Sequence, residues 1–249
     1  MKIAIIGYGK MGQIIERLSE EKKHEVVSTI DPVVGTAKFK ELNKANLSGA
    51  DVAIDFTMPG VALSNIDKYI DSGVNAVIGT TGWYENLEEV KEKVEKSEIG
   101  FIWAANFSIG VNLFFRIIEH SAGLMSNFPV YDVMGYEIHH NRKKDSPSGT
   151  MNMIGEILLE NLKNKKKIVT EKLSRKISEE EMHLASVRGG NVPGTHVINF
   201  DSEVDTIELK HIVRSREGLA EGALKAAEWV KGKKGFYGIE DMMNEIIGG

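Results

Sequence analysis

A short polar segment near the middle of the chain has the residue types that acid–base chemistry needs. It runs from Glu137 to Thr150, reads EIHHNRKKDSPSGT, and brings two histidines, three cations and two carboxylates close together. Lys143 can donate a proton or balance charge, and His139 or His140 can titrate near neutral pH. We therefore expect this segment to hold a small dianion and to supply protons beside it.

The end of the same segment predicts a carboxylate-binding turn. Pro147 marks a turn, and Ser148, Gly149 and Thr150 then open a helix. The first N–H groups of a helix have no partners inside the helix, and the helix dipole favours negative charge there. A carboxylate of the ligand is thus expected at these residues.

The histidines and their loop have two other interpretations. Adjacent residues on a strand point to opposite faces, so His139 and His140 rarely bind one metal ion together. The chain also has no cysteine, and we predict no metal site. An inert cationic loop remains the simpler alternative if only residue types are considered.

A glycine-rich turn near the N-terminus predicts a dinucleotide site. The motif consists of Gly7, Tyr8, Gly9, Lys10, Met11 and Gly12, and it follows an apolar strand and opens a helix. The glycines permit a tight turn and close approach of the backbone to a pyrophosphate. Asp31 ends the next strand, where a carboxylate can accept hydrogen bonds from ribose hydroxyls.

The same aspartate indicates which cofactor is used. A carboxylate repels a 2′-phosphate, and the following Pro32 supplies no positive charge. Lys38 and Lys40 could partly compensate, but a solvated role is the simpler interpretation. We therefore expect NADH as the preferred cofactor, with NADPH possible.

Three further loops are expected at the cofactor-binding edge. In an open parallel sheet, ligands bind beyond the carboxyl ends of the strands. Each loop on its own could also be only a turn of small residues. The residues assigned to the cofactor are Phe56 and Thr57, then Gly79, Thr80 and Thr81, then Ala104, Ala105, Asn106 and Phe107.

The pattern of apolar residues predicts an α/β chain with a Rossmann-type, doubly wound parallel sheet and a second α+β domain with a mixed sheet. Short strands at 2–6, 25–30, 51–55, 75–78 and 100–104 alternate with helices such as 11–21 and 84–96. After about residue 108 the strands at 130–138, 183–187, 196–200 and 206–213 are accompanied by one predicted helix, 150–163. The predicted dinucleotide-binding domain covers 1–108 and 216–249. The predicted substrate-binding and oligomerisation domain covers 109–215.

Composition limits the class of protein. The chain has 249 residues, 42% hydrophobic residues and a net charge of −5, and it lacks an apolar run of the length that a membrane span needs. The negative charge argues against a nucleic-acid partner. Without cysteines or a recognisable signal segment, we predict a cytoplasmic protein. The sequence assigns no role to Arg188, which could reach a substrate or a subunit interface. It also assigns none to His196, which lacks a clustered partner.

The central segment resembles the H-H-x-x-K-x-D-x-P-S-G-T signature of dihydrodipicolinate reductases at every fixed position, from His139 to Thr150. The glycine motif, the loops after the strands and Ser215-Arg216-Glu217 agree in order, so the resemblance covers nearly the whole chain. It implies an NAD(P)H-dependent 4-hydroxy-tetrahydrodipicolinate reductase of lysine and diaminopimelate biosynthesis, assembled as a homotetramer. The main alternative is another NAD(P)-dependent dehydrogenase that acts on an amino acid or imino acid.

The resemblance also implies residue roles. His139 would be the general acid/base and Lys143 the proton donor, while His140, Ser148 and the amides of Gly149 and Thr150 would bind the dicarboxylate substrate. Three positions depart from the family pattern. Pro32 replaces a frequent arginine, Lys144 adds a cation, and Met151 stands where a small residue is usual.

Overall fold

The computed structural model describes residues 1–248 and divides the chain into two compact units. The first comprises Met1–Ile109 with the segment that begins at Arg216, and the second comprises Gly110–Ser215. None of the described helices is long and apolar enough to cross a membrane.

The first unit contains a parallel sheet that is covered by helices on both faces. Its strand order is β11-β5-β4-β3-β1-β2, and every pairing is parallel. The elements are β1 (Lys2–Ile6), α1 (Lys10–Glu21), β2 (Glu25–Ile30), α2 (Lys44–Leu47), β3 (Val52–Asp55), α3 (Pro59–Ser72), β4 (Asn75–Ile78), the 3-10 turn η1 (Tyr84–Asn86), α4 (Leu87–Glu95), β5 (Gly100–Trp103), α7 (Glu217–Val230), β11 (Gly235–Gly238) and α8 (Ile239–Ile247).

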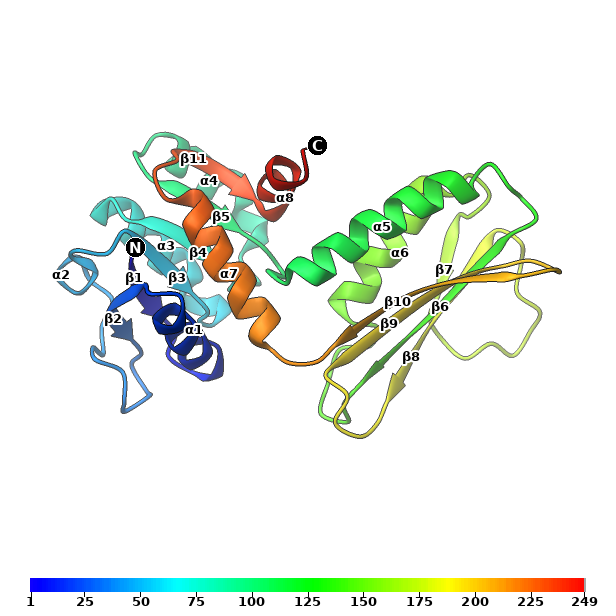
Figure 1. Ribbon diagram of the computed structural model, residues 1–249, viewed down its shortest axis with the longest axis horizontal. Coiled ribbons are helices and arrows are strands. Elements are labelled where there is room, and N and C mark those ends of the chain that lie inside the picture. Colours follow the sequence, from blue (N-terminus) through cyan, green and yellow to red (C-terminus); the bar gives the residue numbers. More distant parts are fainter. Residues whose placement is uncertain (249) are drawn as a thin grey trace. The chain divides into compact units, whose positions relative to one another are not determined.

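Apolar residues on both faces of the strands explain this layering. On one face Ile3, Ile5 and Ile54 pack against α1, α7 and α8, and on the other Ala4 and Ile78 pack against α3 and α4 (Figure 1). A strand with helices over both faces must be apolar at successive positions, which is why β1 reads Ile-Ala-Ile-Ile. The predicted doubly wound parallel sheet is confirmed, and β1 to β5 match the predicted strands to within one residue.

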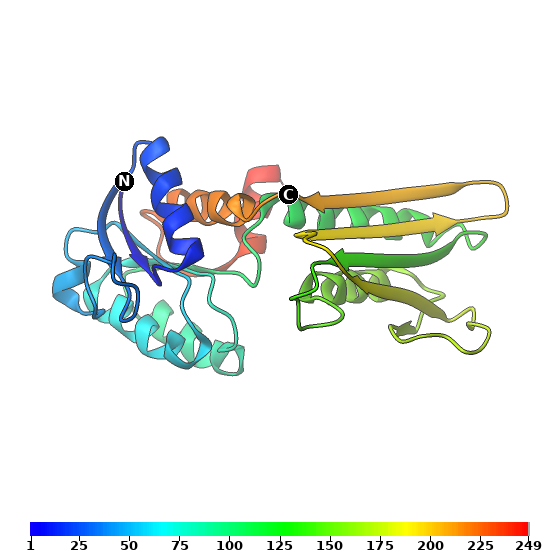
Figure 2. The same ribbon diagram turned by 90° about the horizontal axis from the view of Figure 1, so that it is seen from below.

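The second unit contains a mixed sheet with helices on one face. The strand order is β10-β9-β6-β8-β7, with antiparallel pairs among β10, β9 and β6 and parallel pairs among β6, β8 and β7. In Figure 2 these strands lie in front of the helices. The elements are α5 (Ile109–Met125), β6 (Asp132–His139), α6 (Gly149–Asn161), β7 (Lys167–Val169), β8 (Glu181–Arg188), β9 (Gly194–Asp201) and β10 (Thr206–Val213).

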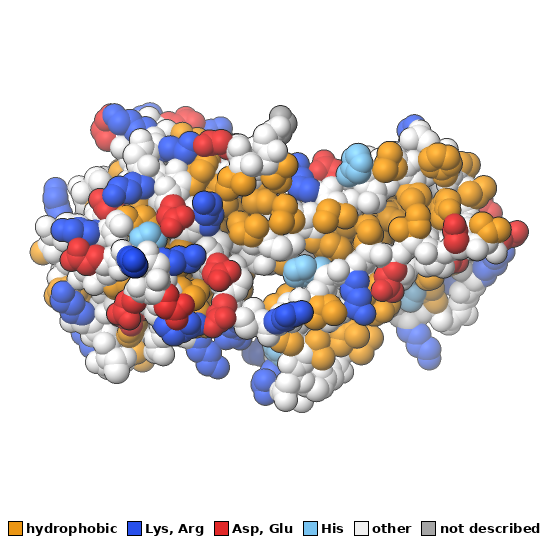
Figure 3. Space-filling view, viewed as in Figure 1, with side chains coloured by type: hydrophobic (Ala, Val, Ile, Leu, Met, Phe, Trp, Pro, Cys, Tyr) orange, Lys and Arg blue, Asp and Glu red, His pale blue; other side chains and the backbone are white. Residues whose placement is uncertain are grey.

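The second core lies between this sheet and its two helices. Phe114 and Ile118 of α5, together with Ile154 and Leu158 of α6, pack on strand residues such as Phe200. The mixed sheet confirms the prediction, whereas the expectation of one helix was wrong because α5 is a second one. Its sequence hides the helical period, since Leu113, Ile117 and Leu124 are apolar yet exposed. Figure 3 shows hydrophobic side chains gathered along this helix.

Candidate active site

The glycine turn after β1 has a conformation and surroundings that require glycine. Gly7 has a φ of +85°, and a Cβ there would lie 2.3 Å from the carbonyl oxygen of Phe56. A Cβ on Gly12 would lie 2.3 Å from the carbonyl oxygen of Gly7. Only glycine tolerates such contacts, so both residues fix the path of the backbone from β1 into α1.

The start of α1 has the properties of a phosphate-binding helix terminus. Its N-cap is Gly9, which offers no side-chain cap, and a Cβ at Gly9 would meet nothing within 4 Å. The first hydrogen bond within the helix is donated by the N–H of Gln13. The N–H groups of Lys10, Met11 and Gly12 therefore have no acceptor inside the helix, and the backbone is open to a ligand at Gly9. These residues fit a dinucleotide pyrophosphate.

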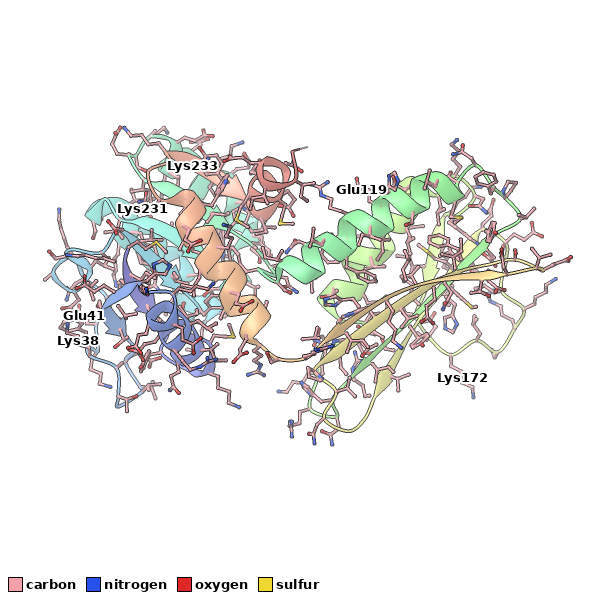
Figure 4. All side chains as sticks on the ribbon, viewed as in Figure 1. Lys38, Glu41, Glu119, Lys172, Lys231 and Lys233 are labelled. Carbon is pink, nitrogen blue, oxygen red and sulfur yellow. The ribbon has the colours of Figure 1, made fainter. Side chains whose placement is uncertain are left out.

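Asp31 lies beside this turn and is charged. One carboxylate oxygen accepts from the N–H of Tyr8 at 2.9 Å, and the other accepts from the N–H groups of Val33 and Val34 at 2.8 and 2.9 Å. Partial burial raises the pKa of Asp31, but these backbone donors and the nearby Lys40 lower it by more, so the pKa lies below its ordinary value. The two candidate cations are engaged, because Lys38 donates to the carbonyl of Val27 and Lys40 to that of Val34. Lys38 lies at the margin of the unit beside Glu41 (Figure 4).

The loops after β3 and β4 are joined by a buried carboxylate to which the sequence did not assign a role. Asp55 is fully buried and accepts from the hydroxyls of Thr57 at 2.7 Å and Thr80 at 2.8 Å. The amide of Asn65 and the hydroxyl of Tyr69 also donate to it, at 3.0 and 2.6 Å. Burial and the carboxylate raise the pKa of Tyr69, so this phenol stays a donor. Asp55 thus fixes the Phe56–Thr57 and Gly79–Thr80 loops at the same sheet edge.

The structure places the other predicted cofactor residues in two groups. Thr81, Ala105 and Lys10 are exposed at the carboxyl edge or at the start of α1, and Met11, Phe56, Gly79 and Asn106 are half-buried. Tyr8, Thr80, Ala104 and Phe107 are buried, and the Phe107 ring packs edge-on against Phe56 with ring centroids 6.4 Å apart. The side chains of this second group therefore take part in packing.

In the second unit, strand register gathers a buried polar cluster around Glu137. On β6, Glu137 lies opposite Ser186 of β8 and His196 of β9, and His139 lies opposite Arg188 of β8. Because side chains alternate along a strand, Glu137 and His139 point to the same face, toward the helices. Glu137, His139 and His196 are 0%, 6% and 2% exposed.

Glu137 is the acceptor on which this cluster converges. Its carboxylate accepts from the N–H of Ser148 at 3.0 Å, from the Ser186 hydroxyl at 2.9 Å and from the Arg188 guanidinium at 2.7 Å. The Ser148 hydroxyl donates to it as well. Burial raises the pKa of Glu137, but hydrogen bonds from His196, Ser148 and Arg188 outweigh this and hold it well below its ordinary value. A charged carboxylate is thereby fixed beneath the predicted catalytic segment.

His139 is neutral in this environment. Burial lowers its pKa to about 4; Glu137 opposes the shift, while His196, Lys143 and Arg188 add to it. Its ring packs edge-on against His196, with centroids 5.2 Å apart. Gly194 makes room for the imidazole, because a Cβ there would lie 3.1 Å from His139 Nε2.

The turn after His139 connects the cluster to α6. Lys143 Nζ contacts the Asp145 carboxylate at 2.9 Å, and Arg188 also donates to the backbone carbonyl of Asp145 at 2.7 Å. Ser148 caps α6 by accepting from the N–H of Met151 at 3.1 Å. The Ser148 hydroxyl is thus engaged inside the protein, whereas Gly149 is exposed and Thr150 half-buried at the first turn of α6.

Several buried nitrogens of this region have no hydrogen-bond partner among the described residues. They are His139 Nδ1, His140 Nδ1, Arg188 Nε and His196 Nδ1. Buried polar groups without partners are rare, and a cluster of them is typical of a site that a ligand or water completes. Glu137, His139 and His196 also lie close enough together to bind a metal ion. Since Arg188 and two serines already occupy the carboxylate, we interpret the group as a hydrogen-bond cluster, and the absence of a metal stays a prediction.

Comparison with known proteins agrees with these features over the whole chain. Family models described as the N-terminal and C-terminal parts of dihydrodipicolinate reductase match residues 1–107 and 110–243. The 4-hydroxy-tetrahydrodipicolinate reductase of Christiangramia forsetii is 38% identical over 248 residues, which cover 99% of both chains, and that of Methanoregula boonei is 34% identical over 97% of both. A dipicolinate-bound dihydrodipicolinate reductase from Paenisporosarcina sp. TG-14 is 26% identical, with a TM-score of 0.79 over 97% of this chain and 98% of the other. Together with the glycine turn and the Glu137 to Thr150 region, these matches show that the chain belongs to the dihydrodipicolinate reductase family.

Proposed function

We propose that this protein is a 4-hydroxy-tetrahydrodipicolinate reductase that uses NAD(P)H, with NADH preferred. In this proposal the first unit binds the dinucleotide at Gly7–Gly12 and Asp31, and the second unit binds the substrate. The product is tetrahydrodipicolinate, an intermediate of lysine and diaminopimelate biosynthesis. The family membership supports the reaction, and the carboxylate of Asp31, which repels a 2′-phosphate, supports the choice of NADH.

The observation that carries the proposal is the combination of charges in one short turn. The ammonium of Lys143 lies within the turn that leads into α6, whose first N–H groups favour an anion. A planar dicarboxylate matches this arrangement of one cation and one helix terminus. Burial lowers the pKa of the nearby His139, so its imidazole is uncharged at neutral pH and can accept a hydrogen bond.

The reaction needs a proton donor where charge develops. Loss of the 4-hydroxyl group as water gives dihydrodipicolinate, which has a conjugated C=C–C=N system. A reduced nicotinamide, when bound, would supply the hydride that adds at the far end of this system. Negative charge then builds on the ring nitrogen, where an ammonium can stabilise it and transfer a proton. We assign that role to Lys143, substrate carboxylate binding to His140, Gly149 and Thr150, and the organisation of the turn to Glu137 and Ser148.

The proposal is tested by oxidation of NADH at 340 nm with enzymatically generated substrate. Lys143→Ala should lower kcat by roughly 10²-fold or more, the usual scale for a catalytic acid. Lys144→Ala is the matched control, because it removes the neighbouring exposed lysine and should change kcat by less than about threefold. A folded wild-type protein that turns over neither NADH nor NADPH would overturn the proposal.

Assembly and location are proposed at the same level. A homotetramer formed through the second unit is supported by the family resemblance and by apolar side chains on the helix-free face of its sheet. Met134, Val187 and Ile212 are each about half exposed there. A cytoplasmic location stays a prediction.

A further inference from the structure

Asp145 places a carboxylate of the protein itself on the cation assigned to catalysis. Its two oxygens each lie 2.9 Å from Lys143 Nζ. The Lys143 side chain is 22% exposed and that of Asp145 is 56% exposed, so the pair lies at the surface of the turn. The charge of Lys143 is therefore balanced by a near neighbour.

The same carboxylate also interacts with the start of α6. Partial burial raises the pKa of Asp145, but the hydrogen bond from Lys143 and the backbone N–H groups of Asp145 and Gly149 outweigh this and lower it. The Gly149 N–H belongs to the first turn of α6, where the substrate carboxylate is expected. Asp145 thus pairs with one cation and lies within electrostatic reach of the helix terminus that a dianionic ligand needs.

We propose that Asp145 is an internal competitor for the substrate carboxylate, and that its displacement from Lys143 and the α6 terminus sets the affinity for the dicarboxylate. This inference rests on the proposed function and adds to it a residue that determines substrate affinity. When the dianionic substrate binds, its ring nitrogen faces Lys143 and one of its carboxylates takes the start of α6, and the Asp145 side chain turns to solvent.

The contacts of Asp145 make this displacement easy. An ion pair whose carboxylate is more than half exposed is weak and screened by salt, so it opens without a large cost. The backbone is held separately, because Arg188 donates to the Asp145 carbonyl at 2.7 Å and is itself fixed by Glu137. The side chain can therefore leave Lys143 while the turn keeps its shape. The fully buried Glu137, with four donors, has no such freedom.

A competitor lowers apparent affinity by the fraction of time for which it occupies the site. If Asp145 engages Lys143 most of the time, then its removal should tighten dicarboxylate binding by roughly threefold to tenfold. The probe is pyridine-2,6-dicarboxylate, the dipicolinate held by the similar reductase from Paenisporosarcina sp. TG-14. Its binding to the full chain saturated with NADH is measured by titration calorimetry for wild type, Asp145→Asn and Asp145→Ala.

The matched control is Glu180→Gln. Glu180 pairs with Lys166 in the same unit and its side chain is 57% exposed, close to the 56% of Asp145. Its replacement removes the same charge at a surface ion pair outside the turn, so binding should stay within about twofold of wild type. Agreement between the two Asp145 variants excludes an effect of the introduced amide.

The kinetic constants KM and kcat distinguish competition by Asp145 from a structural role of this residue. Removal of a competitor should lower KM and leave kcat within about threefold, whereas loss of a residue that orients Lys143 should lower kcat. The inference is overturned if both variants bind the probe with unchanged or weaker affinity, or if kcat falls while affinity stays the same. If the wild type fails to bind the probe as well, then the proposed function itself fails.

Discussion

Replacement of Glu137 by glutamine tests whether one buried carboxylate organises the second unit's site. Glutamine has nearly the same shape but no charge, so Arg188 loses its ionic partner. Breaking a buried ion pair by removal of one partner costs about 3–5 kcal/mol. The Arg188 side chain is 19% exposed and water can solvate it in part, so we expect a loss of about 2–4 kcal/mol.

This loss should be visible in thermal unfolding. For a chain of this size, 1 kcal/mol corresponds to about 2–4 °C in Tm, so Glu137→Gln should unfold roughly 4–16 °C below wild type. We also expect kcat/KM to fall by about tenfold or more, because Ser148 and the first turn of α6 lose their anchor. Circular dichroism and NADH oxidation at 340 nm measure the two effects.

The pH dependence of Tm tests whether the charge of Glu137 causes the loss of stability. The pKa of Glu137 in the folded protein lies well below its ordinary value of 4.5, so its charge stabilises the fold above that pH. The stabilisation is lost as the pH falls from about 4.5 toward the folded pKa. The difference in Tm between wild type and variant should therefore be constant from pH 6 to 8 and narrow below about pH 4.5.

Glu181→Gln is the matched control for this experiment. Glu181 lies on β8 and accepts two hydrogen bonds from Arg175, each at 2.7 Å. It is thus another carboxylate–arginine pair in the same unit, but Arg175 is 52% exposed and its hydrogen-bond partners, Lys176 and Glu181, lie outside the segment from His139 to Thr150. We expect a smaller drop in Tm and unchanged kcat/KM. The reasoning is refuted if Glu137→Gln melts within about 1 °C of wild type, or if Glu181→Gln lowers kcat/KM as strongly.

Two further predictions concern the first unit. Gly7→Ala should weaken NADH binding by tenfold or more, as measured by fluorescence titration, because the new Cβ would lie 2.3 Å from the Phe56 oxygen at a φ of +85°. Gly35→Ala is its control, since a Cβ there meets nothing within 4 Å, and equal binding by the two variants would contradict the argument. Asp31→Asn should raise the ratio of kcat/KM for NADPH to that for NADH by about tenfold, because the charge that repels the 2′-phosphate is removed. An unchanged ratio would show that Asp31 does not set the cofactor preference.

The parallel sheet and the turn into a helix after His139 were predictable because their signals are local. Continuous apolar runs such as Ile3–Ile6 identify strands that are covered on both faces, and the glycine spacing identifies the turn that follows. The segment from His139 to Thr150 is contiguous, so its chemistry can be inferred without knowledge of the fold. Its helix does begin at Gly149, one residue before the predicted start.

The partners of Glu137 were not predictable from the sequence. Ser186, Arg188 and His196 join the cluster only through the register of β6 with β8 and β9, which a single sequence does not reveal. The sequence therefore shows no partner for His196 and assigns no role to Arg188. Alternation on β8 offered one usable signal, because Ser186 and Arg188 occupy the same face as each other.

The charges in the second unit's site fit different roles for His139 and Lys143. A histidine whose pKa is lowered to about 4 holds no extra proton at neutral pH, so it can orient a ligand or accept a proton but is a poor initial donor. Lys143 is exposed enough to meet a ligand and lies in the turn that follows His139. A bound dicarboxylate would raise the pKa of His139 and so counteract the effect of burial, since negative charge favours the imidazolium. The substrate itself would then prepare His139 for proton exchange. Glu137 is buried, charged and hydrogen-bonded, so it would meanwhile hold the strand of His139 and the turn of Lys143 in place.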